Sequence, residues 1–200
     1  SSAASDVYKR QAYTAAALRN HLDLPYYEIA PGYQFLHCLI NNATGGESVA
    51  VDGFKVASYM KENFNEFFET LLETPVKFVN RDYTSNAIRV MHKPLFSLDH
   101  NNDFNDIRFS VAYMGVMDCD PNQMDKFYEA YRKLIALLHD PKFEINFRLK
   151  AGDIFSFNNR RVLHGRKEYD VNSGERHLQG YYIDRDEIIG RLNFLNKINP

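Results

Sequence analysis

The last third of the chain is a succession of short strand-like segments separated by turn residues. These segments are FEINFRL, IFSFNN, RVLHG and RHLQGYYID, with the turn KAGD between the first two. Their lengths and their turn-rich flanks are those of strands rather than of helices. A doubly wound parallel sheet would need a helix between successive strands. The pattern therefore favours an antiparallel sandwich or jelly roll.

The first two thirds of the chain add further strands and two helical regions. Strand-like runs there are YQFLHCLI, ESVAVDGF, TPVKFVN and IRFSVAYM. Apolar residues at three- and four-residue spacings predict one helix or two short ones over 55–72 and another helix over 124–138. Residues 81–106 are polar and irregular, so we expect a loop and a weak hairpin. A short helix, RDEIIGRLNFL, closes a mainly β protein with flanking helices.

The composition is that of one globular domain, which we expect to span residues 1–200. Of these residues 44% are hydrophobic, enough for a sizeable core. The formal net charge of -2 offers no basic field for nucleic acid, and no apolar run reaches the length of about 18 to 20 residues that crosses a membrane. Two cysteines, Cys38 and Cys119, are too few for a disulfide framework, which indicates a cytoplasmic protein. The start, SSAASDVYKRQ, lacks Met, so we expect an N-terminally truncated fragment.

Three residues from the two ends of the chain are candidates for one metal site. His21 and Asp23 are two residues apart, so in an extended segment their side chains project to the same side. His164 is the strongest candidate for a third ligand, because a jelly roll brings early and late strands together. Two histidines and a carboxylate leave three octahedral positions open, as Fe(II) needs for a co-substrate and O₂. Taken alone, the tripeptide favours a surface histidine beside a capping aspartate.

Other motifs narrow the chemistry. HExxH, paired CxxC, Walker and GxSxG motifs do not occur, which excludes the commonest zinc-protease, zinc-finger, nucleotide-binding and serine-hydrolase sites. Arg176 begins the strand-like segment after His164. Its guanidinium could hold the far carboxylate of a dicarboxylic co-substrate through two parallel hydrogen bonds. An ion pair with Glu175 or Asp184 is an equal alternative.

Two blocks of the sequence resemble a known enzyme family. They read AYT…HLDLPYYEIAPGYQFLHCLINNATGGESVAVDGF and AGDIFSFNNRRVLHGRKEY…RHLQGYYIDRDEIIGRLNFL, and they cover roughly half of the chain. They are similar to the gamma-butyrobetaine and trimethyllysine dioxygenases, within the taurine-dioxygenase-like Fe(II)/2-oxoglutarate oxygenases. The resemblance implies a double-stranded β-helix, which is a jelly roll.

The resemblance also implies roles for single residues. His21, Asp23 and His164 would be the ligands of Fe(II), and Arg176 would bind the C5 carboxylate of 2-oxoglutarate. Ser48, in TGGES, stands where relatives place a hydroxyl residue near that co-substrate.

In the same family an aromatic cage holds a trimethylammonium group. Tyr13 and Tyr182 fall on two of its positions, although both could equally be ordinary core aromatics in a chain with 13 Tyr and 15 Phe. Leu22 replaces the usual Thr between the His and Asp ligands. Arg10 stands where butyrobetaine enzymes tend to have Asn, which leaves room for another anionic tail on the substrate.

The function implied by the resemblance is hydroxylation of a small quaternary-ammonium molecule with Fe(II), 2-oxoglutarate and O₂. Gamma-butyrobetaine, which gives carnitine, is the first choice of substrate, and trimethyllysine or a trimethylammonium alkylphosphonate is the alternative. Two rivals come from other classes, namely a jelly roll with a metal of no redox role and a non-enzymatic binding module. A homodimer is left open.

Overall fold

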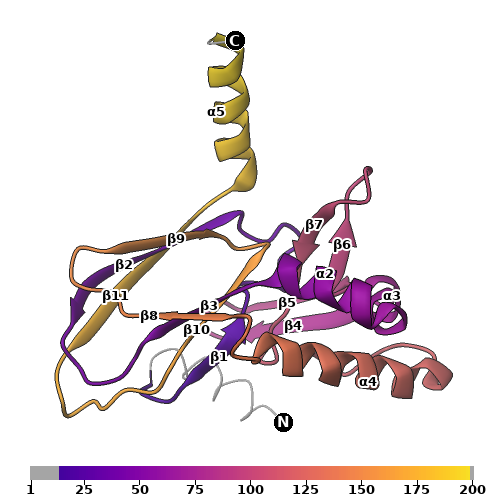
Figure 1. The fold of residues 1–200 in the computed structure, drawn as a ribbon, viewed down its shortest axis with the longest axis horizontal. Helices are drawn as coiled ribbons and strands as arrows, with labels where there is room; N and C mark the ends of the chain where they lie inside the picture. The colour runs from indigo at the N-terminus through magenta and orange to yellow at the C-terminus, as the bar shows by residue number, and fades with distance from the viewer. Residues whose placement is uncertain (1–13, 199–200) are drawn as a thin grey trace.

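The computed structural model describes residues 14–198, which form two antiparallel sheets (Figure 1). The strands of the first sheet are, in spatial order, β1 (Leu18–His21), β10 (Val162–Arg166), β3 (Ser48–Asp52) and β8 (Glu144–Phe147). Those of the second sheet are β11 (Arg176–Ile183), β2 (Tyr33–Asn41) and β9 (Ile154–Asn158). Aromatic side chains join the sheets, as where the rings of Phe147 and Phe155 lie 4.8 Å apart. Early strands lie beside late ones, and the predicted jelly roll is confirmed.

Three helices pack beside the sheets, at the end where Figure 1 also places the hairpins described below. They are α2 (Gly53–Asn63), α3 (Asn65–Glu73) and α4 (Pro121–Leu138). The periodic region 55–72 forms two helices because the chain leaves the helical conformation at Phe64. The carboxylates of Asp52 and Asp120 accept hydrogen bonds from the first free backbone N–H groups of α2 and α4. Pro121 is favoured directly after such a cap, so α4 begins earlier than its apolar pattern predicts.

Two hairpins occupy residues 76–107, where the sequence predicted the strand TPVKFVN followed by a loop and a weak hairpin. They consist of β4 (Val76–Asp82) with β5 (Ala87–Lys93), and of β6 (Phe96–Leu98) with β7 (Phe104–Ile107). The β4–β5 hairpin is regular, with seven pairs of residues in register. The strand predicted over residues 107–114 is wrong, because only Ile107 belongs to a strand and turns follow it.

The main core lies between the helices and the hairpins. Phe68 of α3 is fully buried, and its ring centroid lies 5.4 Å from that of Phe96 in β6. Phe127 of α4 is also fully buried and stacks on Tyr131 at 5.8 Å. Each fully buried aromatic side chain contributes about 1.5–3 kcal/mol through removal of its apolar surface from water. The contact between Phe68 and Phe96 therefore packs α3 against the β6–β7 hairpin.

The last helix, α5 (Arg185–Ile198), extends away from the sheets (Figure 1). Arg185, at its start, donates a hydrogen bond to the Asn105 side-chain oxygen at 2.9 Å. Further along, Leu192 and Phe194 are 49% and 52% exposed. The predicted closing helix is confirmed. Among residues 14–198, no helix is both long enough and apolar enough to cross a membrane.

A buried arginine fixes the loop that follows the candidate metal ligands His21 and Asp23. The Arg108 guanidinium donates hydrogen bonds to the backbone carbonyls of Pro25, Tyr27 and Glu28 at 2.6–2.9 Å, and it pairs with Asp106 at 3.1 Å. We expect Arg108→Met to cost about 3–5 kcal/mol of unfolding free energy, because it leaves a buried carboxylate without its partner. Urea unfolding measures this cost.

The exposed Arg191 of α5 supplies the control for this prediction. Arg191→Met removes the same charge at the surface and should change the unfolding free energy by no more than about 0.5 kcal/mol. Equal effects of the two substitutions would show that the Arg108 contacts do not stabilise the loop.

Candidate functional site

The two candidate histidines meet across a pair of antiparallel strands. His21 on β1 lies directly opposite His164 on β10, and their ring centroids are 4.4 Å apart. Residues opposite each other in an antiparallel pair project to the same face, which explains the contact. The pairing of the first and the tenth strand thus brings together residues from the two ends of the chain.

Asp23 reaches the histidines from the bend that follows β1. The strand ends at His21, two residues before Asp23, so it does not cover the whole His-x-Asp segment. Leu22 points into the core with 2% exposure, and its backbone N–H donates to the Phe109 carbonyl at 2.8 Å. The Asp23 side chain nevertheless returns to the histidines. Its Oδ1 lies 3.3 Å from Nε2 of His21, and its Oδ2 lies 3.9 Å from Nε2 of His164.

Two buried polar residues that sequence reasoning missed hold Asp23 in place. The side chain of Asn159, which is 1% exposed, accepts from the Asp23 N–H and donates to the Asp23 carbonyl, both at 3.1 Å. Gln34, which is 3% exposed, donates from Nε2 to Asp23 Oδ2 at 2.7 Å. A polar side chain inside the apolar run YQFLHCLI was the available signal for Gln34, because a buried polar group needs a partner.

The charges of the three groups are coupled. Burial would lower the pKa of His21, but the hydrogen bond and the charge of Asp23 outweigh burial and raise it. Burial and the neighbouring His21 lower the pKa of His164 to about 4. Burial would raise the pKa of Asp23, yet the imidazoles of His164 and His21 lower it. At neutral pH the cluster therefore offers an ionised carboxylate and a neutral His164, the forms that ligate metals.

The three side chains fit a single metal ion. One ligand atom from each of His21, Asp23 and His164 lies within 4.8 Å of the other two. Nδ1 of His21 lies 2.9 Å from the Arg19 carbonyl, which can only accept a hydrogen bond. Nδ1 must therefore carry a proton, and Nε2 is the nitrogen left for a metal. Two imidazoles and one carboxylate suit a first-row transition metal that keeps open positions.

Arg176 begins β11 and forms no ion pair with Glu175 or Asp184 among residues 14–198. Its Nε is buried and has no hydrogen-bond partner in this part of the chain. Its guanidinium lies over the Tyr169 ring, 5.6 Å from the centroid. Burial and the positive charge of Arg166 lower the pKa of Arg176. A half-buried cation without a carboxylate is a place for an anionic ligand.

The turn between β2 and β3 makes room for this arginine. Gly46 has a φ of +73°, a conformation that L side chains rarely adopt, and an added Cβ there would meet Arg176 Nε at 3.1 Å. Ser48 follows in β3, is 5% exposed and lies opposite Arg166 of β10. The structure thus brings TGGES next to Arg166 and Arg176, and the role of Ser48 beside a co-substrate stays a prediction from the resemblance.

Tyr182 lies against the metal-ligand candidate Asp23. Its hydroxyl donates to Asp23 Oδ2 at 2.6 Å, although 42% of the residue is exposed. Burial of the hydroxyl and the charge of Asp23 raise the Tyr182 pKa, so the phenol remains a donor. Tyr26 and Tyr113, whose ring centroids are 4.7 Å apart, also contribute to this shift. Sequence reasoning missed both of these aromatic neighbours.

The predicted positions Tyr13 and Arg10 lie outside the described residues. The segment that follows them is tied to β10, because Arg166 donates hydrogen bonds to the backbone carbonyls of Thr14 and Ala16 at 2.5 and 2.7 Å. The structure thus places this part of the chain beside the arginines, and the roles of Tyr13 and Arg10 remain predictions from the resemblance.

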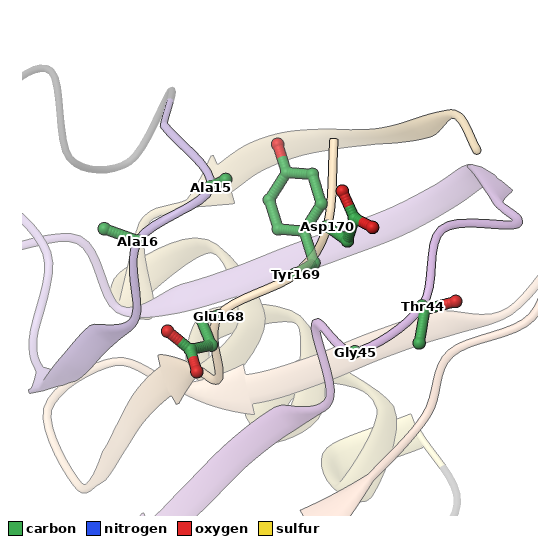
Figure 2. Close-up of a pocket in the computed structure, with 7 residues that line it drawn as sticks. All are labelled: Ala15, Ala16, Thr44, Gly45, Glu168, Tyr169 and Asp170. Atoms are coloured by element: carbon green, nitrogen blue, oxygen red, sulfur yellow. The ribbon is translucent and has the colours of Figure 1, made fainter. Parts of the chain in front are cut away.

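A pocket of about 510 Å³ is lined by Tyr169 and six other residues, and none of the three candidate metal ligands is among them (Figure 2). Three segments form its walls: Ala15 and Ala16 before β1, Thr44 and Gly45 after β2, and Glu168 to Asp170 after β10. Tyr169 connects the pocket to the arginines, because its ring contacts both Arg166 and Arg176. The donor atoms of His21, Asp23 and His164 converge on one another and not on this pocket.

Comparisons with known proteins agree with this geometry. The chain is 42% identical over 186 residues to the gamma-butyrobetaine dioxygenase of Pseudomonas sp. (strain AK-1), covering 93% of this chain and 48% of that protein. It is 33% identical over 196 residues to the trimethyllysine dioxygenase of Meyerozyma guilliermondii, covering 96% of this chain and 48% of that protein. The chain thus spans about half the length of these curated relatives.

A solved structure shares the fold. It is an asparagine oxygenase in complex with Fe(II), 2S,3S-3-hydroxyasparagine and succinate, with a TM-score of 0.66 over 84% of this chain and 50% of that chain. At 20% identity this likeness establishes the fold alone. The family itself follows from the sequence: residues 2–182 match the family described as "Taurine catabolism dioxygenase TauD, TfdA family", and the chain belongs to it.

Proposed function

We propose that residues 1–200 form a single catalytic domain that hydroxylates a trimethylammonium substrate with Fe(II), 2-oxoglutarate and O₂. The observation that carries the proposal is the convergence of His21, Asp23 and His164 on one point. The metal, when bound with 2-oxoglutarate, would supply O₂ activation, so that substrate C–H becomes C–OH while 2-oxoglutarate becomes succinate and CO₂. A metal of no redox role would explain the same ligands but not the anion site at Arg176.

The protein's own groups would orient the reactants. Arg176 would bind the C5 carboxylate of 2-oxoglutarate through the fork of its guanidinium, with Ser48 beside it as a hydroxyl donor. The other end of 2-oxoglutarate, with its 2-oxo group and C1 carboxylate, would then face the histidines. β10 of the first sheet carries His164 and pairs with β3, which carries Ser48, whereas Arg176 begins β11 of the second sheet. The co-substrate would therefore bind between groups that the two sheets supply.

Gamma-butyrobetaine is the substrate that we propose first. The chain is 42% identical to a gamma-butyrobetaine dioxygenase and 33% identical to a trimethyllysine dioxygenase. The 33% identity makes trimethyllysine the second candidate. The suggestion of a trimethylammonium alkylphosphonate depends on Arg10 alone. A quaternary ammonium group donates no hydrogen bond, so its recognition depends on aromatic faces. Tyr182, beside Asp23, is the described residue that would supply such a face.

The substrate proposal predicts a preference for the cation that depends on the Tyr182 ring. In the full-length protein, succinate formation is measured with gamma-butyrobetaine and with its uncharged tert-butyl analogue. We expect the wild type to prefer the cation and Tyr182→Leu to lose about 0.5–2 kcal/mol of that preference, the strength of one cation–π contact. Trimethyllysine in the same assay ranks the second candidate.

The neighbouring Tyr181 provides a matched control. It is 43% exposed, against 42% for Tyr182, but its ring stacks on Phe35 at 4.8 Å. Tyr181→Leu should keep the preference for the cation. If the wild type accepts the neutral analogue as readily as the cation, the trimethylammonium proposal is wrong.

We also propose a cytoplasmic location. Cys38 and Cys119 are both free thiols, and Cys38 is buried, as in a protein that stays in a reducing compartment. A small-molecule substrate needs no macromolecular partner, and a homodimer remains a hypothesis that measurement of the molecular mass in solution decides.

A further inference from the structure

The two carboxylate oxygens of Asp23 have different surroundings. Oδ2 accepts hydrogen bonds from Gln34 Nε2 at 2.7 Å and from the Tyr182 hydroxyl at 2.6 Å. Oδ1 has neither donor and lies 3.3 Å from Nε2 of His21. A carboxylate oxygen that accepts two short hydrogen bonds has little lone-pair capacity left for another bond. Oδ1 is therefore the oxygen better placed to ligate a metal.

The two donors come from one strand pair of the second sheet. Gln34 on β2 lies directly opposite Tyr182 on β11, so antiparallel pairing places both side chains on the same face. Gln34 is 3% exposed, and its Oε1 has no hydrogen-bond partner among residues 14–198. Within the described part of the chain, the buried Gln34 side chain therefore makes its hydrogen bond to Asp23.

The main chain of Asp23 is fixed as well. Asn159 bonds both the N–H and the carbonyl of Asp23 at 3.1 Å, and its own N–H donates to the Gly32 carbonyl at 2.9 Å. With the backbone held on one side and Oδ2 held on the other, rotation of the carboxylate about its axis would break two short hydrogen bonds. The orientation of Oδ1 toward the histidines is therefore set by the fold.

We propose that Gln34 and Tyr182 are positioning residues that restrict Asp23 to a single-oxygen metal ligand. The inference rests on the proposed metal site. A carboxylate that binds through both oxygens takes two of six octahedral positions and, with two histidines, leaves two open. A carboxylate that binds through one oxygen leaves three, which is what a two-point co-substrate and O₂ together require. By holding Oδ2, the two donors preserve the third position.

Co(II) titration tests this proposal without turnover, because the absorption spectrum of Co(II) reports its coordination number. The proteins compared are the full-length wild type, Tyr182→Phe, Gln34→Met and the double variant. We expect each single variant to bind Co(II) roughly 10–100-fold more weakly, as is typical when a partner of a metal ligand is lost. The double variant should also show a changed Co(II) spectrum and weaker 2-oxoglutarate binding to the Co(II) protein.

Tyr181→Phe is the matched control, because it removes a phenol of nearly the same exposure that does not reach Asp23. It should leave both affinity and spectrum unchanged. Unchanged Co(II) affinity and spectrum in the double variant, with thermal unfolding confirming that it is folded, overturn the proposal while the metal site stands. A wild type that binds no Co(II) overturns the metal site and the proposal together.

Tyr182→Phe also separates this role from the proposed substrate cage, because it keeps the aromatic ring and removes only the hydroxyl. Its preference for gamma-butyrobetaine over the tert-butyl analogue should persist while Co(II) affinity falls. Loss of the preference with unchanged Co(II) affinity would assign the hydroxyl to the substrate and overturn the positioning role.

Discussion

His164→Ala is expected to abolish 2-oxoglutarate turnover and to weaken metal binding by at least about 100-fold, since even loss of a ligand's hydrogen-bond partner costs 10–100-fold. The reason is geometric. His164 supplies one of three donor groups within 4.8 Å of one another, and two remaining donors hold an ion poorly. Succinate formation and Co(II) titration on the full-length protein measure the two effects.

The fold should survive this substitution. His164 is 7% exposed, its ring centroid lies 5.0 Å from that of Phe157, and its Nδ1 has no hydrogen-bond partner among the described residues. Thermal unfolding of the metal-free protein checks the fold, and His164→Gln repeats the test with less lost volume. His139→Ala, in a histidine at the end of α4 that is not part of the cluster, should keep turnover. Turnover at the wild-type rate in either His164 variant would refute the ligand assignment.

The predicted strands that proved correct are those with strong local signals. YQFLHCLI corresponds to β2, Tyr33–Asn41, because it is apolar along its length and turn residues flank it. β4 was predicted as the run TPVKFVN, but its partner β5 was missed for a physical reason. Its outward-facing residues Ile88 and Val90 are 63% and 46% exposed, so apolar residues face solvent there and the pattern no longer reports burial. Asn86, with a φ of 52°, completes the turn between the two strands, in which the Asp82 carboxylate accepts from the backbone N–H groups of Thr84 and Ser85.

The segment 107–114 failed as a strand because distant contacts decide its conformation. The Arg108 side chain binds carbonyls 80–83 residues away in sequence, and the Phe109 carbonyl accepts from the Leu22 N–H. Apolar content predicts burial, which is correct for Phe109 at 0% exposure, but it does not predict whether the backbone pairs with a strand or with a loop.

The candidate site also has a part that the sequence predicted and a part that it did not. The spacing of His21 and Asp23 and the late position of His164 predicted a cluster, and the strands do bring these residues together. The apolar run around Gln34 signals a buried polar group, but no local pattern identifies Asp23, 11 residues away, as its partner. Asn159 has no such signal, and its partner Asp23 lies 136 residues away. Metal ligands can be recognised in a sequence by their residue type. The residues that orient them here are ordinary amides, whose role is seen only from their contacts in the structure.

Arg176→Lys is expected to raise the 2-oxoglutarate concentration for half-maximal turnover by roughly 10–100-fold, because each hydrogen bond to a charged group contributes about 1.5–3 kcal/mol. The buried Nε of Arg176 has no partner in the described part of the chain, so the guanidinium fork is available for a carboxylate. Lys keeps the charge but loses the planar pair of donors, and its ammonium carries a more costly hydration shell into this half-buried site. The iron requirement should change little, because Arg176 is not in the metal cluster.

Succinate formation measured against 2-oxoglutarate at fixed iron, and against iron at fixed 2-oxoglutarate, separates the two requirements. Arg161→Lys is the control: Arg161 is exposed and its guanidinium binds Asp52 through two hydrogen bonds, at 3.0 and 2.6 Å, away from the anion site. Arg161→Lys loses the same fork geometry and should leave the 2-oxoglutarate and iron requirements unchanged. An equal rise in both requirements for Arg176→Lys would mean that the substitution disturbs the metal cluster through β11 and that Arg176 does not select the co-substrate. A rise in the 2-oxoglutarate requirement alone would assign the distal carboxylate to Arg176. The iron requirement depends on the metal cluster, whereas the 2-oxoglutarate requirement depends on both the cluster and the anion site.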